Sequence, residues 1–231
     1  MTNEIFEKDY TYSEIFENLK KDDLDDFTKI SSIINIEKIE NSEDFKILIY
    51  HLTNHPTPIR EIVAIKLEEI SKHNIEFFVN DDLKEQLLNA VIDINPNVSR
   101  AICSILENNE KLVDFIFDDL ILKTKNTMNE IKEILNSKEP KTKKSHAKNK
   151  KVFAFYWFLE AISSTKTIKN NAEALEIVNF ALDFPDYTIR EKGAKILTKI
   201  QSPPLKLLQK AKSDQNFYVK NLLCGKIDYD E

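Results

Sequence analysis

The chain contains only two glycines among its 231 residues, Gly193 and Gly225, where average usage would give about sixteen. Dinucleotide-binding folds, phosphate-binding loops and hairpin-rich sheets need glycine where the backbone turns sharply or approaches a ligand. Because 42% of the residues are apolar, the chain can still build a continuous core. The sequence therefore excludes most glycine-dependent folds and predicts helices joined by short turns.

Helix-start signals followed by apolar residues at spacings of three and four recur along the chain. Thr57 is expected to cap a helix with proline in its first turn, and Ile59 and Val63 begin its apolar stripe. Ser42 is expected to cap the helix before it. Similar helix pairs end in second helices that open near residues 95, 186 and 214. Only the short run IEFFV (75–79) has a strand-like pattern.

Three stretches share one pattern, in which a turn residue is followed by an aliphatic residue and then, one or two residues later, by an arginine. They are PTPIREIVAIKLEEI, PDYTIREKGAKILTKI and, less closely, NPNVSRAICSILENN. All three arginines of the chain, Arg60, Arg100 and Arg190, lie near the start of these second helices, with Arg100 one residue out of register. Since lysine is ten times more frequent here, arginine at these places indicates a need for its planar set of donors.

These residues resemble the HEAT family of α-solenoids, whose second helix opens with a turn residue, Val-Arg, a small residue and Leu. Ile59-Arg60 and Ile189-Arg190 match best, and Gly193 takes the small position. The resemblance implies an all-α fold, an α–α superhelix of about five helix pairs. It also implies a ladder in which Arg60, Arg100 and Arg190 meet turn acids of neighbouring repeats, with Asp186 as one candidate acid.

Charge is distributed unevenly along the chain, whose net charge is −6. Residues 1–137 hold 28 acids and 15 bases, whereas residues 138–231 hold 11 acids and 18 bases. We therefore expect four segments: an N-terminal helical cap (1–41), acidic HEAT-like repeats (42–137), a Lys-rich loop (138–151) and mildly basic HEAT-like repeats (152–231).

The Lys-rich segment has seven lysines and no apolar residue beyond Ala147. We interpret it as a solvated loop, with contact to phosphate, nucleic acid or an acidic partner as the alternative. The aromatic run that follows covers nearly every helical direction, which favours a buried helix over an exposed patch. The candidate binding residues of this region and of the helix after it are Lys141, Lys143, Lys144, Lys148, Lys150, Lys151, Tyr156, Trp157, Lys192, Lys195 and Lys199.

No phosphate-binding loop and no Ser–His–acid set is recognisable, so no catalytic residue is assigned. His51 and His55 have the i, i+4 spacing of metal ligands, but no third ligand is evident, and neither a metal nor a cofactor is expected. Cys103 and Cys224 are interpreted as buried thiols. Without a visible signal peptide or membrane-spanning run, a cytoplasmic location is the default expectation.

The function that we expect is a non-catalytic scaffold that binds another protein through the concave face of the solenoid. The alternative is a DNA-repair glycosylase of the alkylpurine type, because DQNFYVKNLLCGK faintly resembles the last repeats of a bacterial HEAT-like family. In that family tryptophans and a catalytic aspartate line a basic cleft, whereas this chain has one tryptophan with no aspartate beside it. A bilin-lyase-like role has no specific residue in its favour. Nucleic acid is thus the less favoured partner, and a membrane is not expected.

Overall fold

The computed structural model describes residues 9–166, 168 and 171–224. The chain divides into two compact units, unit 1 over Met1–Leu112 and unit 2 over Val113–Glu231. This boundary lies inside the segment 42–137 that the sequence suggested as one block. The first residues of the expected cap and the last residues of the expected final repeat lie outside the described residues.

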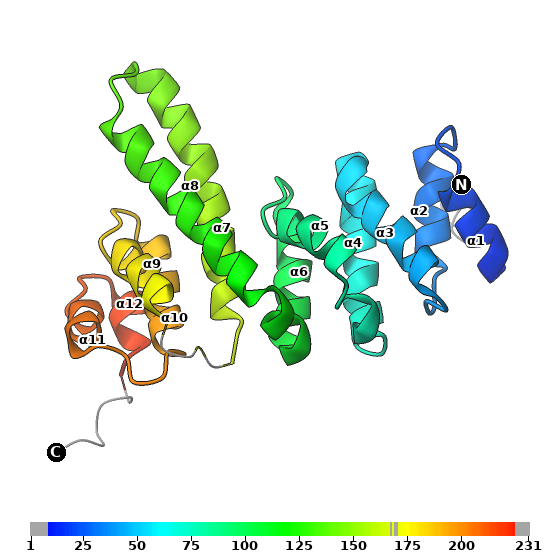
Figure 1. Cartoon of the computed structure of the whole chain (residues 1–231). Coiled ribbons are helices and arrows are strands. Elements are labelled where there is room, and N and C mark those ends of the chain that lie inside the picture. Colours follow the sequence, from blue (N-terminus) through cyan, green and yellow to red (C-terminus); the bar gives the residue numbers. More distant parts are fainter. Residues whose placement is uncertain (1–8, 167, 169–170, 225–231) are drawn as a thin grey trace. The chain divides into compact units, whose positions relative to one another are not determined.

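Unit 1 is built from antiparallel helix pairs (Figure 1). Its second helices pack against one another and against their own partners, with α4 contacting α2, α3 and α6. The elements are α1 (Tyr12–Leu19), α2 (Asp26–Ile34), α3 (Ser42–Asn54), α4 (Thr57–Ser71), the short 3-10 helix η1 (Ile75–Phe77), α5 (Asp81–Val91) and α6 (Pro96–Asn108).

Unit 2 repeats the same arrangement around α10, which contacts α8, α9, α11 and α12. The helix α7 begins in the last residues of unit 1 and continues into unit 2. The elements are α7 (Glu110–Asn136), α8 (Lys141–Ser163), α9 (Ala172–Leu182), α10 (Tyr187–Leu197), α11 (Leu205–Lys212) and α12 (Phe217–Asn221). Within unit 2 the second helices α8, α10 and α12 are neighbours.

The predicted fold class is confirmed: the described chain is all-α, with the helix pairs of an α–α superhelix. Five pairs run from α3 to α12, after a helical cap formed by α1 and α2. The strand-like run 75–79 contains the helical turn η1 instead. The described residues contain no strand beyond one isolated bridge between Ile168 and Ile200. None of the described helices is both long and apolar enough to cross a membrane.

Helix starts are fixed by side chains that accept hydrogen bonds from the first turn. Asn95 and Asp186 cap α6 and α10 as expected, each accepting from the backbone N–H two residues on. Two other predicted caps are wrong. Asn41, not Ser42, caps α3, and α4 begins at Thr57 itself, without a side-chain cap.

The close packing of α9 and α10 depends on the small residue predicted from the repeat. A Cβ added to Gly193 would lie 2.9 Å from the Cβ of Ala181, which is closer than side-chain carbons approach in proteins. Both residues are buried. Glycine is therefore needed here for the distance between two helices, and not for a special backbone conformation.

The prediction of a loop over 138–151 is wrong, because α8 already begins at Lys141. Lysine is a good helix former, and the second half of the same helix is anchored in the core by Phe155 and Leu159. A helix that is nucleated at its buried end extends through residues that have no apolar face. The high charge of the segment therefore marked solvent exposure and not irregular structure.

Candidate functional site

In unit 1 an arginine links two successive second helices. Arg60 on α4 donates from Nε to Asp93 Oδ2 at 2.8 Å and from Nη2 to Asp93 Oδ1 at 3.0 Å. It also donates to the carbonyl oxygen of His55 at 2.7 Å. Asp93 Oδ1 accepts in addition from the backbone N–H of Asn95, which caps α6. One carboxylate therefore joins the previous repeat to the start of the next helix.

Unit 2 contains the same arrangement between α10 and α12. Arg190 donates from Nε and Nη2 to the two carboxylate oxygens of Asp214, at 2.7 and 3.2 Å. Asp214 also accepts from the backbone N–H of Asn216, the cap of α12. The hydrogen bond from Arg190 lowers the pKa of Asp214 below its ordinary value. An Asp-x-Asn sequence before the second helix is the signal that sequence reasoning missed.

The predicted ladder is thus present at two of its three arginines. Arg100 is exposed, and among the described residues its side chain donates only to the side chain of Asn97 in its own helix. Asp186 does not receive Arg190 but caps α10. In the repeat pattern, Ser99 stands where arginine is expected, and its hydroxyl donates to the carbonyl oxygen of Asp93.

A charged cluster connects α8 with α10. Glu160 lies 2.5 Å from Lys192 Nζ and 3.5 Å from Lys195 Nζ, and Lys192 Nζ lies 5.3 Å from the centre of the Tyr156 ring. Burial acts to raise the pKa of Glu160, but the two lysines outweigh it and hold the pKa below its ordinary value. Because Lys192 and Lys195 are neutralised within the fold, they hold two helices together more than they attract a partner.

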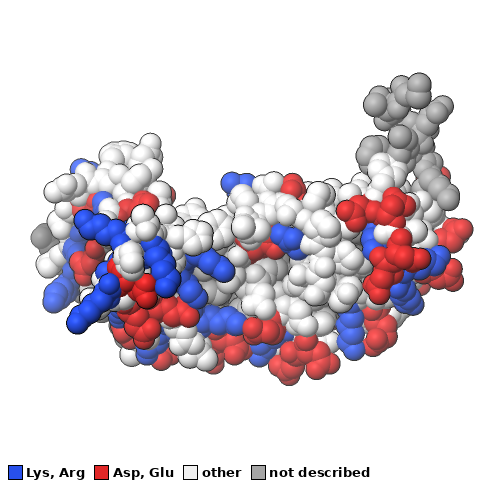
Figure 2. Space-filling view, turned by 90° about the horizontal axis from the view of Figure 1, so that it is seen from above, with Lys and Arg blue, Asp and Glu red and all other residues white. Residues whose placement is uncertain are grey.

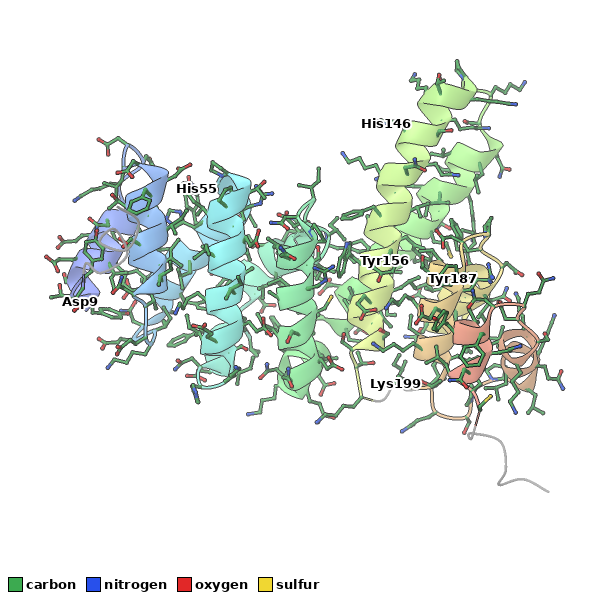
Figure 3. The ribbon with its side chains drawn as sticks, turned by 180° about the vertical axis from the view of Figure 1, so that it is seen from behind. Asp9, His55, His146, Tyr156, Tyr187 and Lys199 are labelled. Carbon is green, nitrogen blue, oxygen red and sulfur yellow. The ribbon has the colours of Figure 1, made fainter. Side chains whose placement is uncertain are left out.

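Trp157 is not the exposed anchor that was offered as an alternative: only 6% of it is accessible. Tyr156 is half-buried beside Lys192. Figure 3 shows Tyr156 on α8 and Tyr187 on α10 in the same part of unit 2, while Lys199 lies at the far end of α10. The aromatic run therefore belongs mainly to the core of unit 2.

Exposed aromatic rings gather instead at the start of the two following second helices. Tyr187 opens α10, and Phe217 and Tyr218 open α12. The rings of Tyr187 and Tyr218 are stacked with centroids 6.4 Å apart, and those of Phe217 and Tyr218 meet edge to face at 5.8 Å. Their exposures are 41%, 62% and 61%. We call Tyr187, Phe217 and Tyr218 the aromatic patch. Sequence reasoning missed it because it looked for an exposed aromatic surface only in the run that now forms part of α8.

The Lys-rich segment forms the outer part of a helical hairpin made by α7 and α8, which extends beyond α9 in unit 2 (Figure 1). We call residues 130–151 the lysine arm; it holds eight lysines and three glutamates. Lys151 pairs with Glu130 across the hairpin, and Lys144 Nζ donates to the carbonyl oxygen of Leu135. Lys143 pairs with Glu139. In Figure 2 long Lys and Arg side chains stand out on the same side of the view as unit 2.

A hollow of about 290 Å³ lies where the lysine arm meets the turn between α9 and α10. Leu135, Val152 and Phe184 give it apolar walls, and Lys148 lies at its edge. This volume is at the lower end of the range of small-molecule sites. It fits a single apolar side chain of a partner better than an organic cofactor.

Two histidines of unit 1, the buried His51 and the half-buried His55, lie side by side with ring centroids 4.3 Å apart. His51 Nε2 donates to the carbonyl oxygen of Leu19 at 2.8 Å. Burial lowers the pKa of His51 to about 4, and burial also lowers the pKa of His55. Both rings are therefore neutral near pH 7. The described residues contain no group of three His, Cys, Asp or Glu side chains that could hold a metal ion.

The two cysteines lie in different environments. Cys103 is buried in α6, as predicted, whereas Cys224 is exposed, so the prediction for Cys224 is wrong. Its sulfur lies on the solvent side just after α12, a helix of five residues that buries little more than Val219. The helical spacing indicated a packed position, but the short last helix has no neighbour on that side among the described residues.

No family model matches the chain, and no curated protein matches it. Among solved structures, an engineered protein from the Northeast Structural Genomics Consortium is similar over 96% of both chains, with 14% identity and a TM-score of 0.51. A second engineered protein from the same consortium is 16% identical over 91% of this chain and 92% of its own, with a TM-score of 0.47. The first likeness extends to the all-helical fold alone.

Proposed function

We propose that the protein is a non-catalytic scaffold of HEAT-like repeats that binds another protein through the face formed by α8, α10 and α12. The observation that carries this proposal is the aromatic patch. Its three rings contact one another but leave much of their surface in water, on two successive second helices. Such surface is unfavourable in a protein that acts alone, and its burial against a partner is favourable.

The chemistry of the aromatic patch fits a protein partner. Tyrosine and phenylalanine are enriched at the centres of protein interfaces, where rigid rings bury a large area at low cost in side-chain entropy. The patch lies on helices whose starts are fixed by Asp186 and by the pair Arg190–Asp214. A surface held in this way meets its partner without a large ordering cost.

The glycosylase alternative finds less support in the same region. Base recognition in such an enzyme needs an accessible tryptophan beside an acid. Trp157 is buried, and Glu160, the acid one turn further on, is paired with Lys192. The aromatic patch offers rings, but among the described residues no carboxylate is hydrogen-bonded to them. Protein binding is therefore the function that we propose.

The proposal can be tested with a photo-crosslinking residue placed at Tyr187 or Tyr218 in cells that express the protein. We expect one protein to be crosslinked from both positions, and we expect Y187S/F217S/Y218S to lose it in a co-precipitation. The matched control is F27S/Y50S, which removes two exposed rings from unit 1. If the triple variant and the control retain the same set of proteins, the aromatic patch is not the binding surface.

A further inference from the structure

The lysine arm lacks a core of its own. Ile131 and Phe155 are fully buried, yet every residue between them is exposed or half-buried. A helical hairpin of this kind gains little from burial, and short helices without packing are marginal in water. The arm therefore adds little to the stability of unit 2, and its features need an explanation outside the fold.

The charges of the arm oppose the helix that carries them. Lys141, Lys143 and Lys144 occupy the first turn of α8, where the helix dipole favours negative charge, and this turn contains no acid. Pro140 precedes the helix and gives no side-chain cap. A sequence that served only the helix would place acids here. Placing three cations here favours an external anion.

Four ammonium groups of the arm remain available to such an anion. Within the described chain no hydrogen bond or ion pair engages Lys138, Lys141, Lys148 or Lys150, whereas Lys143, Lys144 and Lys151 have partners. Lys141 and Lys148 lie about two turns apart on one face of α8, about 10 Å apart along its axis, whereas Lys150 lies on the opposite face. A nucleic-acid duplex carries about six phosphate charges over this length.

The composition of the arm distinguishes among classes of polyanion. Lysine is depleted at the cores of protein interfaces, which use arginine and aromatic rings instead. The segment 138–151 contains no Phe, Tyr or Trp on which an unpaired base could stack. It also has no apolar face that could enter a lipid surface. Lysine ammonium groups bind phosphates as point charges, and such contacts hold a duplex without reading its sequence.

We propose that the lysine arm binds the phosphate backbone of a double-stranded nucleic acid, without sequence preference, through Lys138, Lys141 and Lys148. This goes beyond the proposed scaffold function, which depends on burying the rings of the aromatic patch against a protein and not on ion pairs with phosphate. The arm gives the scaffold a second attachment, to a duplex, while the patch holds a protein.

The test measures binding of a fluorescent 24-base-pair DNA duplex of mixed sequence to the whole chain by anisotropy between 50 and 200 mM KCl. Three phosphate contacts predict an affinity about 40-fold weaker at the higher salt concentration. We expect K138Q/K141Q/K148Q to weaken binding at 50 mM KCl by at least about tenfold. Glutamine keeps the helix propensity, so the melting temperature of this variant should not fall.

The matched control is K20Q/K21Q/K72Q, which removes the same charge from exposed lysines of unit 1. It should keep duplex affinity within about threefold. An RNA duplex, a single strand, polyglutamate and phosphatidylserine vesicles are measured in parallel, and the two duplexes should bind best. The proposal is overturned if no duplex binds at 50 mM KCl, if both variants lose binding equally, or if polyglutamate or vesicles bind more tightly than either duplex.

Discussion

Replacing Arg60 with alanine should destabilise unit 1 by about 3 kcal/mol. The change removes two hydrogen bonds to Asp93 and one to the carbonyl oxygen of His55, and it leaves the Asp93 carboxylate without its counter-charge. Breaking a buried ion pair costs about 3–5 kcal/mol. Because the side chains of Arg60 and Asp93 are 14% and 12% exposed, water relieves part of this cost, which places the effect at the lower end of the range.

The assay is urea unfolding followed by circular dichroism, supported by amide hydrogen exchange, which reports each unit separately. Arg100→Ala is the matched control, since this arginine is exposed and, within the described part of the chain, bonds only to Asn97 in its own helix. Its effect should stay below about 0.5 kcal/mol. Arg60→Lys should recover only part of the loss, because an ammonium cannot make the two-pronged contact.

A comparison of two variants decides whether the pairing of Arg60 with Asp93 contributes to the unfolding free energy of unit 1. If Arg60→Ala and Arg100→Ala destabilise unit 1 equally, the pairing with Asp93 contributes nothing and the reasoning is refuted. A double-mutant cycle with Asp93→Ala gives the coupling directly. We expect the losses of unfolding free energy in the two single variants to add up to more than the loss in the double variant, because each single change leaves a charge without its partner.

Three further predictions concern buried groups. Burial lowers the pKa of His51 to about 4, below the 6.5 of an unperturbed histidine, so between these pH values the unfolded chain binds more protons than the folded chain. Unit 1 should therefore lose stability as the pH falls from 6.5 to 4. Urea titrations should show a weaker pH dependence of stability in His51→Gln. Gly193→Ala should lower the melting temperature, because its Cβ would meet Ala181 at 2.9 Å, and A181G/G193A should restore part of the loss. Trp157 is 6% exposed, so its fluorescence should resist acrylamide, and quenching as strong as that of free tryptophan would contradict the packing of α8.

The fold followed from the sequence because its signals are local. Asn95 and Asp186 cap helices by reaching the backbone two residues away, and apolar spacing shows which side of a helix is buried. The ladder could be predicted in part, because the scarcity of arginine marked Arg60 and Arg190. Their partners could not be named, since Asp93 and Asp214 lie 33 and 24 residues further along the chain.

The candidate binding surface was harder to predict from the sequence, for a physical reason in each case. The aromatic side chains of α8 project in nearly every direction around the helix, so spacing alone did not show that Trp157 would be buried. Lys192 looked like a solvated lysine because its partner, Glu160, lies on another helix. Exposed rings such as Tyr218 resemble core residues in composition, and only the three-dimensional arrangement shows that no described helix covers them.

The absence of buried side chains between Ile131 and Phe155 has a consequence for how this protein can change over time. Residues can be added to or removed from the tip of the hairpin in whole helical turns without disturbing any packed layer of unit 2. The reach of the arm is therefore an adjustable length. Related chains could differ greatly there while keeping the same body.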